Sequence, residues 1–350
     1  MKHLLATLLF VCSLNSHAAD LTRPPSQAKE LLIQLHNKQL SEQHSKKYSA
    51  PTSYTQGRPF AEYEQTKYLF FSVDTPFKSE PIKGEIAKNL PNDTILVLYK
   101  VPGPDKDYWE KIYSKYIPPS RLRIIELEKA TSGFWSRDGL PIATYNNESS
   151  LEFVDAKYYH GFEPDKEMSE LFHVPLFSHN YYFEGGNFMP NRLGDCLVVN
   201  NPRVKDIPDS IFIEKYSCHK LIRLPFVKGI GHADESVKFI DDHTVLTDTE
   251  SYIPLLEENG FKVIRLPRPT NNYETYVNSL IVNGTVFVPT FAEPTDEQAL
   301  SVYKNLGLKV VGINSSYLSN NGMGSIHCIT MGYPDLDFHD LTHMLNNIEH

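Results

Sequence analysis

The sequence predicts one α/β domain that holds most of the chain. Short runs of β-branched and aromatic residues alternate with segments of helical pattern from Lys67 onward, and no linker rich in Pro, Gly or Ser divides them. Asn283-Gly284 lies between two such runs and predicts a tight β-hairpin. The chain has 350 residues, of which 41% are hydrophobic and 22% charged, as in folded globular proteins. We therefore expect residues 67–350 to form a single domain, preceded by an N-terminal extension over residues 19–66.

The predicted strands share three properties: they are short, rich in β-branched or aromatic residues, and bounded by turn-forming residues. They are residues 68–73, 94–99, 122–127, 181–183, 196–199, 221–224, 237–240, 244–247, 262–266, 279–282, 285–288 and 309–313. Many short strands with helices between them and no linker favour one mixed α/β unit over two domains.

Predicted helices are fewer than predicted strands. The clearest begins at Thr295, a residue type that caps helix N-termini, and continues with an apolar stripe that includes Ala299 and Tyr303. Further helices are expected over residues 26–36, 252–260 and 341–348. The first of these lies in the N-terminal extension and the last is expected to be peripheral.

The first residues have the pattern of a secretory signal peptide. Lys2 gives a short positive region, Leu4 to Leu14 is an apolar run too short to span a bilayer, and Ser16-His17-Ala18 offers a cleavage site. We expect residues 1–18 to be removed and the mature protein to be periplasmic or secreted. No second long apolar run follows, so no membrane anchor is expected. A formal charge of -9 argues against a nucleic-acid partner.

Export also bears on the cysteines. Cys12 is lost with the signal peptide, which leaves Cys196, Cys218 and Cys328 in an oxidising compartment. An odd number requires a free thiol or an intermolecular pair, and the simplest interpretation leaves Cys328 free. Cys196 and Cys218 have two interpretations, a disulfide or two buried thiols, and their spacing does not decide between them.

Cys328 is the candidate nucleophile. It follows a run of small residues at Gly324-Ser325 and has a distant histidine and distant carboxylates as candidate partners. The alternative is an inert buried cysteine. The neighbouring His327 is not expected to be its base, because adjacent side chains on a strand point to opposite faces.

His232-Ala233-Asp234 is a better partner for such a thiol. Residues two apart in an extended segment share a face, so the imidazole and the carboxylate would point into one cleft. A histidine exchanges protons near neutral pH, and an aspartate orients a cation. The alternatives are a polar surface turn and a metal site, which would still need a third ligand.

Two other motifs carry candidate binding residues. Trp135 and Asp138 lie in the segment Phe134-Trp135-Ser136-Arg137-Asp138, where the carboxylate would be a clamp for a cationic substrate or an ion-pair partner of Arg137. Glu184-Gly185-Gly186-Asn187 has paired glycines that permit either close approach of a ligand or a tight turn. No Lys-Ser/Thr pair follows it, which argues against a phosphate-binding loop.

Together, Asp138, Glu184, His232-x-Asp234 and Cys328 resemble the agmatine deiminase and bacterial-type (Porphyromonas-type) peptidylarginine deiminase family of the guanidino-group-modifying superfamily. The resemblance extends from about Tyr68 to Pro334. Its stretches are FWSRDGLP, FEGGNFMPN, GDCLVVNNPR, GIGHADESVKF, VNSLIVNGTVFVPTFAEPTDEQAL and GSIHCITMGYP.

The resemblance implies a pentein fold, an α/β propeller in which five ββαβ-like units surround a central cavity. It also implies the site residues. Cys328 would be the nucleophile, His232 the general acid/base, and Asp138 and Asp234 the carboxylates that hold a guanidinium. The substrate-binding residues would be Glu184, Trp135, Asn187 and Asn278. No cofactor and no metal are expected.

The expected activity is hydrolysis of an arginine-type guanidinium to a ureido group, with release of ammonia through a covalent thiouronium on Cys328. Export favours arginine within peptides or proteins, whereas Glu184 favours the alternative substrate agmatine, which would give N-carbamoylputrescine. A cysteine protease and a non-catalytic pentein-fold binding protein are two further hypotheses. A protease would have no use for Asp138 and Asp234 as cation clamps.

Overall fold

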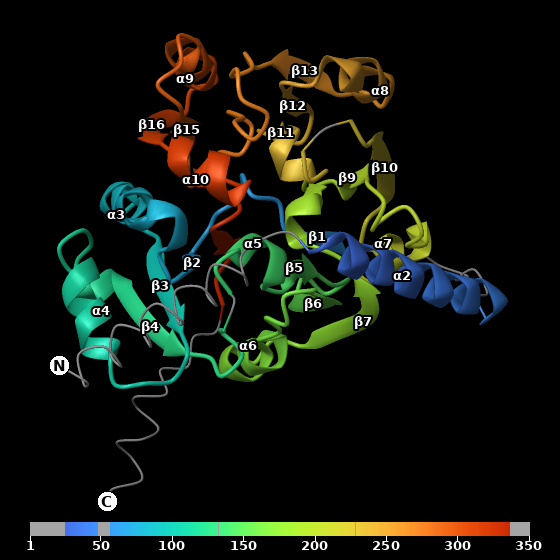
Figure 1. The fold of residues 1–350 in the computed structure, drawn as a ribbon, viewed down its shortest axis with the longest axis horizontal. Helices are drawn as coiled ribbons and strands as arrows, with labels where there is room; N and C mark the ends of the chain where they lie inside the picture. Colours follow the sequence, from blue (N-terminus) through green and yellow to red (C-terminus); the bar gives the residue numbers. More distant parts are fainter. Residues whose placement is uncertain (1–24, 48–56, 132, 228, 337–350) are drawn as a thin grey trace, which may run out of the picture.

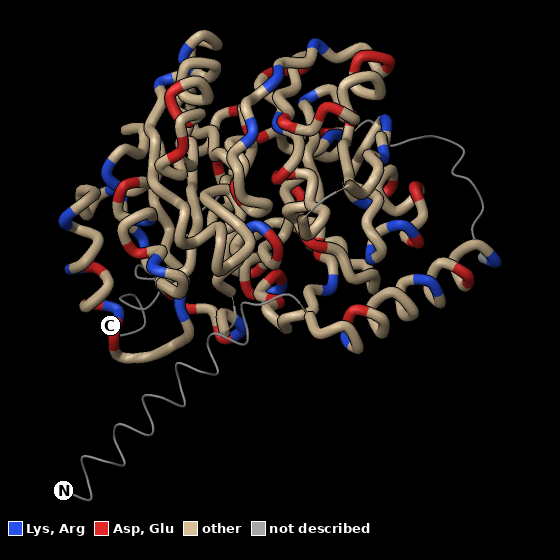
Figure 2. Tube along the Cα trace, turned by 45° about the horizontal axis from the view of Figure 1, so that its top comes forward, with Lys and Arg blue, Asp and Glu red and all other residues tan. Residues whose placement is uncertain are grey.

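A computed structural model describes residues 25–47, 57–131, 133–227 and 229–336. The predicted signal peptide (residues 1–18) and the predicted helix over 341–348 lie outside the described residues. Within them, no helix is both long and apolar enough to cross a membrane. Lys and Arg positions are interspersed with Asp and Glu along the described trace (Figure 2).

The described residues form five sheets that lie around a common centre (Figure 1). The strand order of the first is β1 (Arg58–Pro59), β5 (Ile142–Tyr145), β6 (Leu151–Lys157), β7 (Leu176–Tyr182). The second and third are β10 (Lys220–Pro225), β9 (Asp195–Asn200), β8 (Met189–Pro190), and β11 (Val237–Phe239), β12 (Thr244–Thr247), β13 (Lys262–Arg265). The last two are β14 (Leu280–Val282), β15 (Thr285–Thr290), β16 (Lys309–Asn314), and β17 (Met331–Tyr333), β2 (Tyr68–Ser72), β3 (Ile95–Lys100), β4 (Leu122–Glu126).

Each sheet repeats one pairing pattern. An antiparallel pair is followed by a parallel partner: β14 pairs antiparallel with β15, and β15 pairs parallel with β16. The same pattern holds for β5-β6-β7, β8-β9-β10, β11-β12-β13 and β17-β2-β3. The sequence shows no legible repeat, so this regularity lies in the backbone pairing and not in the residues. The fold is a mixed α/β fold, as predicted.

The helices connect and cover these sheets. They are α2 (Gln27–Lys47), α3 (Glu80–Asn89), α4 (Lys106–Tyr113), α5 (Ser136–Gly139), α6 (Asp165–Phe172), α7 (Asp209–Glu214), α8 (Ile253–Glu258), α9 (Asp296–Asn305) and α10 (Ser316–Gly322). Helices α3, α4, α8 and α9 lie on the outside, whereas α5 and α10 lie near the centre (Figure 1).

Most predicted strands are present with ends shifted by one or two residues, and the hairpin prediction is confirmed. Asn283 and Gly284 adopt left-handed backbone angles (φ 45° and 77°) between the antiparallel strands β14 and β15. Strands β5 and β6 and helix α3 were not predicted. Helix α3 has Pro81 in its first turn and Gly84 in its interior, both weak local signals, and forms because Ile82 and Ile86 are buried against the sheets.

Residues 57–66, placed in the predicted extension, contribute directly to the sheets and to the interior. β1 pairs antiparallel with β5, and the backbone N–H of Thr66 donates to the side-chain oxygen of Asn283 at 2.8 Å. Glu62 also points inward, with a side chain only 10% exposed. The predicted helix over 26–36 is longer than expected, and Asn37 on it bonds the backbone of Tyr182 on β7.

The core fixes the position of β17, the strand that follows Cys328. Tyr333 on β17 lies edge-on to Phe70 on β2, with ring centroids 5.1 Å apart, and packs on Phe153 on β6 at 5.4 Å. Its hydroxyl donates to the carbonyl of Pro141 at 2.7 Å. Burying each such ring stabilises the fold by about 1.5–3 kcal/mol relative to exposure. The nucleophile loop is therefore tied to two sheets.

Cys196 and Cys218 form a disulfide. This resolves the two interpretations that the sequence left open. The bond joins β9 to the residues just before β10, its parallel neighbour. Cys328 is the free cysteine among the described residues, as predicted, and it is buried.

Candidate active site

Cys328 lies in a turn between α10 and β17. Its carbonyl accepts a hydrogen bond from the N–H of Arg137 at 3.1 Å, and the next carbonyl, that of Ile329, accepts one from the Ser136 hydroxyl at 3.0 Å. Thr330 closes the turn by donating to the carbonyl of Ile326 at 2.9 Å. The nucleophile loop is thus fastened to α5, the helix that carries Asp138.

Gly324 explains the small residues before Cys328. A Cβ at this position would lie 2.8 Å from the Trp135 ring and 3.2 Å from the Cys328 sulfur. The glycine therefore lets the backbone pass closely between the indole and the thiol, so that both side chains face the same space.

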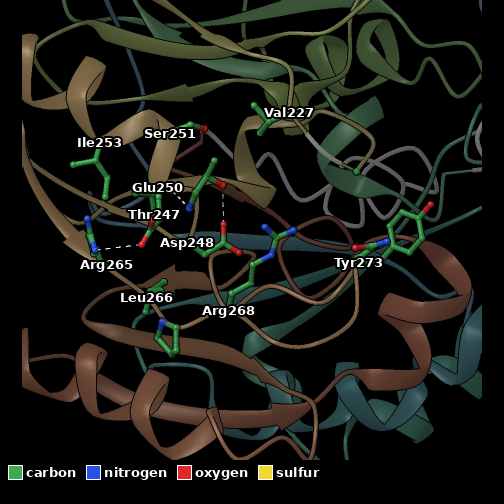
Figure 3. A pocket seen from close by; sticks show the side chains of 14 residues that line it. Val227, Thr247, Asp248, Glu250, Ser251, Ile253, Arg265, Leu266, Arg268 and Tyr273 are labelled. Atoms are coloured by element: carbon green, nitrogen blue, oxygen red, sulfur yellow. Dashed lines mark hydrogen bonds and ion pairs between the residues drawn. The ribbon is translucent and has the colours of Figure 1, made fainter.

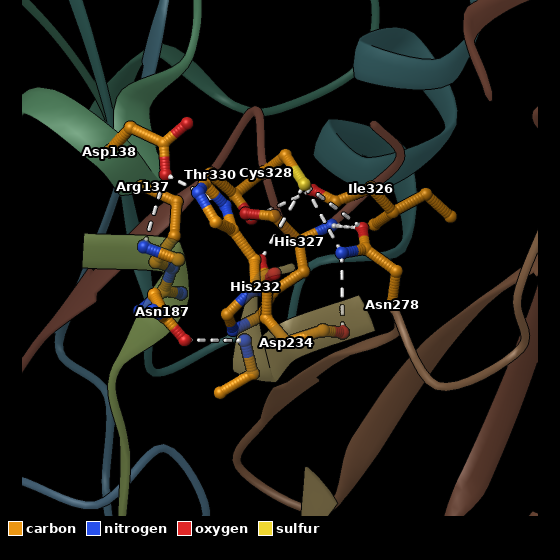
Figure 4. A network of polar contacts seen from close by, with 12 residues as sticks. Arg137, Asp138, Asn187, His232, Asp234, Asn278, Ile326, His327, Cys328 and Thr330 are labelled. Carbon is orange, nitrogen blue, oxygen red and sulfur yellow. Dashed lines mark hydrogen bonds and ion pairs between the residues drawn. The ribbon is translucent and has the colours of Figure 1, made fainter. Parts of the chain in front are cut away.

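The sulfur of Cys328 has two polar neighbours, which Figure 4 shows on one side of it. The amide nitrogen of Asn278 lies 3.1 Å from the sulfur, and the Oδ2 of Asp234 lies 3.5 Å from it. Asn278 also donates to the backbone carbonyl of Asp234 at 3.3 Å. Of the predicted substrate-binding residues, Asn278 is therefore in contact with the sulfur itself.

His232 lies between two carboxylates. Its backbone is extended (φ −95°, ψ 147°), and residues 233–235 follow as a single 3₁₀ turn. Its Nδ1 is 3.6 Å from Asp138 Oδ1, and its Nε2 is 3.3 Å from Glu184 Oε2. The spacing of His232 and Asp234 thus brings both side chains to one buried site, as the sequence predicted.

Gly186 allows Asp138 and His232 to meet. Its N–H donates to Asp138 Oδ1 at 3.0 Å, and a Cβ there would lie 2.7 Å from that oxygen and 2.8 Å from His232 Nδ1. The paired glycines of this motif therefore serve close approach and not only a turn. Asn187, the fourth residue of the motif, has another task. Its side chain bonds the backbone of Val199 and Ala233, and it does not line the cavity.

The charges on this side of the site are strongly coupled. Burial would lower the pKa of His232, but the carboxylates of Glu184 and Asp138 raise it to about 10, so the ring is an imidazolium at neutral pH. Burial raises the pKa of Asp138 to about 7 against the effect of His232, and the Glu184 and Asp234 carboxylates add to the rise. For Glu184, burial is outweighed by Arg203 and His232, which lower its pKa to about 2.

The thiol is not ionised in the empty site. Burial raises the pKa of Cys328 well above its ordinary value, and the carboxylates of Asp234, Glu235 and Asp138 raise it further. A cation placed between the thiol and these carboxylates would reverse much of this effect. The arrangement is suited to a nucleophile that ionises when a cationic ligand binds.

His327 and Glu62 are site residues that the sequence reasoning missed. His327 Nδ1 is 2.7 Å from Asp234 Oδ2, and its Nε2 contacts Glu62. The sequence predicted that His327 is not the base for Cys328, and its ring contacts two carboxylates; the premise of that prediction was wrong, because residues 326–329 form a turn and not a strand. Glu62 is also bonded by Lys238 Nζ at 2.8 Å. No local motif marks Glu62, since its partners are distant in sequence.

A narrow cavity of about 30 Å³ lies beside the thiol. Its lining residues are Trp135, Asp138, Tyr159, Glu184, Arg203, Ile230, Gly322, Met323, Gly324 and Cys328. The Oδ1 of Asp234 is buried and accepts no hydrogen bond from the described residues, although Asp234 is not among the residues that line the cavity. Within the described part of the chain, no group of His, Cys, Asp or Glu side chains could hold a metal ion.

Comparison with known proteins shows the family of the chain. The family described as Porphyromonas-type peptidyl-arginine deiminase matches residues 85–334. The chain belongs to this family. It is therefore a deiminase, a hydrolase that acts on the C–N bonds of a guanidino group, and the family resemblance inferred from the sequence is confirmed.

Individual relatives are distant. An agmatine deiminase from Medicago truncatula is 24% identical over 310 residues, which cover 65% of this chain and 81% of that protein. The solved agmatine deiminase of C. jejuni shares 19% identity with a TM-score of 0.66, covering 83% of this chain and 98% of its own. That of Enterococcus faecalis shares 18% with a TM-score of 0.64, covering 82% and 100%. At these identities the structural likeness establishes the deiminase fold.

Proposed function

We propose that this protein is an exported deiminase that converts the guanidinium of peptidyl-arginine to the ureido group of citrulline. The observation that carries the proposal is the placement of one thiol beside Asp234 and Asp138, with the imidazolium of His232 next to the second carboxylate. Carboxylates on two sides suit a planar cation with several N–H donors. We also infer the α/β-propeller arrangement of the pentein fold for the five sheets around this site.

The proposed reaction begins when the guanidinium binds between Asp138 and Asp234. The bound cation lowers the thiol pKa, the proton leaves to solvent, and the Cys328 thiolate adds to the guanidinium carbon to form a C–S bond. His232 donates its proton to the departing nitrogen, the C–N bond breaks, and ammonia leaves a thiouronium on Cys328. His232, now neutral, takes a proton from water, which attacks the same carbon. The C–S bond then breaks as the hydroxyl proton of this adduct leaves to solvent, and the neutral ureido product and the Cys328 thiolate separate.

Two observations support peptidyl-arginine as the substrate and export as the context. Glu184 is already paired with Arg203 at 3.0 Å and with His232, so it offers no uncompensated charge to the distal ammonium of agmatine. The Cys196–Cys218 disulfide is typical of oxidising compartments and supports a periplasmic or secreted protein. The proposal includes no nucleic-acid partner and no membrane anchor.

Agmatine is the second candidate substrate, and one residue favours it. Glu30 on α2 lines a hollow outside the cavity, 3.8 Å from Arg203, and its side chain is 28% exposed. It could bind the free ammonium of a guanidine that reaches out of the cavity. The named activity of the similar structures points the same way.

A panel of substrates scored for ammonia release tests the proposal. Agmatine, free arginine, acetyl-arginine amide and an arginine peptide are compared, with Cys328→Ala as the inactive control. We expect the acetylated amide and the peptide to be converted with the highest kcat/KM. Release from agmatine alone, reduced in Glu30→Gln, would replace peptidyl-arginine by agmatine. No release from any member, together with no adduct between Cys328 and a haloacetamidine, would indicate a binding protein instead.

A further inference from the structure

Two hollows lie outside the catalytic cavity: the first adjoins the cavity, and the second adjoins the first. The first has a volume of about 680 Å³ and shares Arg203, Ile230 and Met323 with the lining of the cavity. The second has a volume of about 890 Å³ and shares Gly229 and Tyr273 with the first. The cavity and the first hollow therefore have a wall in common, and so do the two hollows. The outer hollows exceed what a small guanidine needs, since drug-sized ligands fill about 300–1,000 Å³.

Both hollows are lined in part by exposed apolar residues. Phe226 lines the first hollow and is 46% exposed, and Val227 lines the second and is 47% exposed. They are neighbours in the loop after β10, close to the shared residue Gly229. Adjacent exposed apolar side chains beside a concave surface are typical of a binding site for a partner chain.

The second hollow also offers polar and charged groups along its walls (Figure 3). Asp248, Glu250, Arg265 and Arg268 line it, so it holds as many acidic as basic residues. Glu250 and Arg265 face each other at 3.3 Å. A balanced set of charges next to apolar anchors suits a polypeptide of mixed composition better than a polyanion or a polycation.

We propose that the two hollows form a groove that binds the polypeptide chain flanking the target arginine. This inference rests on the proposed function and deepens it. The arginine side chain enters past Ile230 and Met323, the residues between the groove and the cavity. The flanking residues then lie over Phe226, Val227 and Tyr273. The cavity of about 30 Å³ holds roughly one water, so these wall residues move aside when the guanidinium enters.

The test compares acetyl-arginine amide with a peptide that carries several residues on each side of the arginine. We expect the wild-type kcat/KM for the peptide to exceed that for the amide by about 10-fold or more. Val227→Ser should remove most of that gain and leave the amide within about twofold. Leu193→Ser is the matched control, because Leu193 is also an exposed apolar residue, at 46%, but lies outside both hollows.

Several outcomes would overturn the groove. The proposal fails if the kcat/KM for the peptide does not exceed that for the amide, or if Val227→Ser lowers kcat/KM equally for both substrates. In both cases conversion of the amide leaves the proposed deimination of arginine intact. If agmatine is converted and neither arginine derivative is, the proposed substrate is wrong and the groove falls with it.

A second inference concerns the residues behind Asp234. Both ring nitrogens of His327 face carboxylates, Nδ1 toward Asp234 and Nε2 toward Glu62. The ring therefore bridges the two carboxylates and ties Asp234 to Glu62. Glu62 is anchored in turn by Lys238 Nζ at 2.8 Å, by the backbone N–H of Ile281 at 2.9 Å and by Arg137 at 3.4 Å.

We infer that His327 and Glu62 are positioning residues that hold Asp234 as an oriented anion beside the Cys328 sulfur. His327 binds Oδ2 of Asp234, which leaves the unpartnered Oδ1 free for the substrate cation. Neither residue touches the substrate in this arrangement; both act through Asp234.

Alkylation of Cys328 by two probes tests this role. Chloroacetamidine is cationic and uses the carboxylates, whereas iodoacetamide is neutral. His327→Gln should slow the cationic probe by about 10-fold or more, as loss of supporting hydrogen bonds does behind other functional groups, and should change the neutral probe far less. Glu62→Asp keeps the charge and should recover part of the loss seen in Glu62→Gln. Glu64→Gln is the control, since Glu64 pairs with Arg58 away from the thiol.

Equal slowing of both probes would show that His327 only maintains the loop, and unchanged rates would show that Asp234 needs no support. If His327→Gln does not fold, the Glu62→Asp and Glu62→Gln pair gives the same comparison. Recovery of the cationic rate by the shorter acid supports the inference, and identical rates in the two variants overturn it.

Discussion

Asp138 and Asp234 are the two carboxylates of the proposed guanidinium site, and their surroundings differ. Asp234 faces His327 at 2.7 Å, and this hydrogen bond and charge outweigh burial and hold its pKa below the ordinary value. Asp138 has His232 at 3.6 Å and shares that histidine with Glu184, and burial raises its pKa to about 7. One carboxylate is kept as an anion by the protein, whereas the other reaches full charge when a cation arrives.

The difference assigns an order to binding. If the proposed function is correct, we expect Asp234 to attract the guanidinium first, because its charge is already present and its Oδ1 lacks a partner among the described residues. The cation then favours ionisation of Asp138 and of the Cys328 thiol, since its charge opposes the cause of both raised pKa values. The site therefore becomes reactive only when its ligand is in place.

Replacing either carboxylate by its amide gives the largest expected effect short of removing the thiol. Asp234→Asn and Asp138→Asn should each lower kcat/KM for a guanidino substrate by about 100-fold or more, about 3 kcal/mol of transition-state stabilisation. The two should differ in KM. Asp234→Asn should raise KM more, because it removes the charge that the empty site already holds.

Asp242→Asn is the control for this pair. Asp242 is a mostly buried carboxylate whose side chain bonds Arg192 and Tyr63 and no described residue of the site. Equal changes in KM and kcat in the two site variants would show that Asp138 and Asp234 do not differ in how they contribute to substrate binding. Retained activity in Asp138→Asn would show that Asp138 is not needed to hold the substrate cation.

The sequence predicted which residues form this site, but not how the surroundings of Asp138 and Asp234 differ. Cys328, His232, Asp138 and Asp234 could be found because each lies in a local motif, and Gly186 and Gly324 mark where the chain must pass closely. The asymmetry between the carboxylates comes from His327 and Glu62, which meet across 265 positions. Such a contact leaves no local pattern to detect.

The fold shows the same limit. Strands with dense branched and aromatic residues, such as β3 and β15, were predicted almost to the residue. Strand β6, with the sequence LEFVDAK, alternates less clearly and takes its structure from pairing with β5 and β7. Asn187 was expected to bind substrate from its motif alone, but its side chain is used by the backbone of Val199 and Ala233.

The pH dependence of kcat/KM also distinguishes Asp138 from Asp234, and its expected size lies between those of the carboxylate variants and the disulfide variant. In the free enzyme Asp138 is protonated below its pKa of about 7, so its ionisation should give kcat/KM an acid limb near that pH, in addition to the rise that ionisation of the Cys328 thiol causes below its raised pKa. The kcat/KM should fall again above about 10 as His232 loses its proton. Asp234 adds no limb in this range, because His327 holds its pKa below the ordinary value of a carboxyl despite burial.

The limbs of the profile can be assigned with one variant. Asp138→Asn should abolish the limb near pH 7 and keep the limb near 10, and the acid limb of kcat in the wild type should lie at lower pH than that of kcat/KM, because bound substrate lowers the pKa of Asp138. An acid limb that persists unchanged in Asp138→Asn would assign it to another group and break the contrast with Asp234.

Removing the disulfide should have the smallest effect on catalysis, and any effect should fall on the Asp138 side. The double variant Cys196→Ala/Cys218→Ala releases a loop of 22 residues and should lower the free energy of unfolding by about 3 kcal/mol in urea titrations. Activity below the unfolding transition should stay within about twofold.

The disulfide supports β9, whose Val199 donates its backbone N–H to the Asn187 side chain. The same Asn187 oxygen also accepts the N–H of Ala233, the neighbour of His232. Loosening β9 should therefore disturb His232, and with it the limb of the kcat/KM profile near pH 10, more than it disturbs Asp234. Asp234 is held by His327, which in turn contacts Glu62. A shift of the cationic-probe rate without a shift of that limb would show that the two carboxylates are not supported separately.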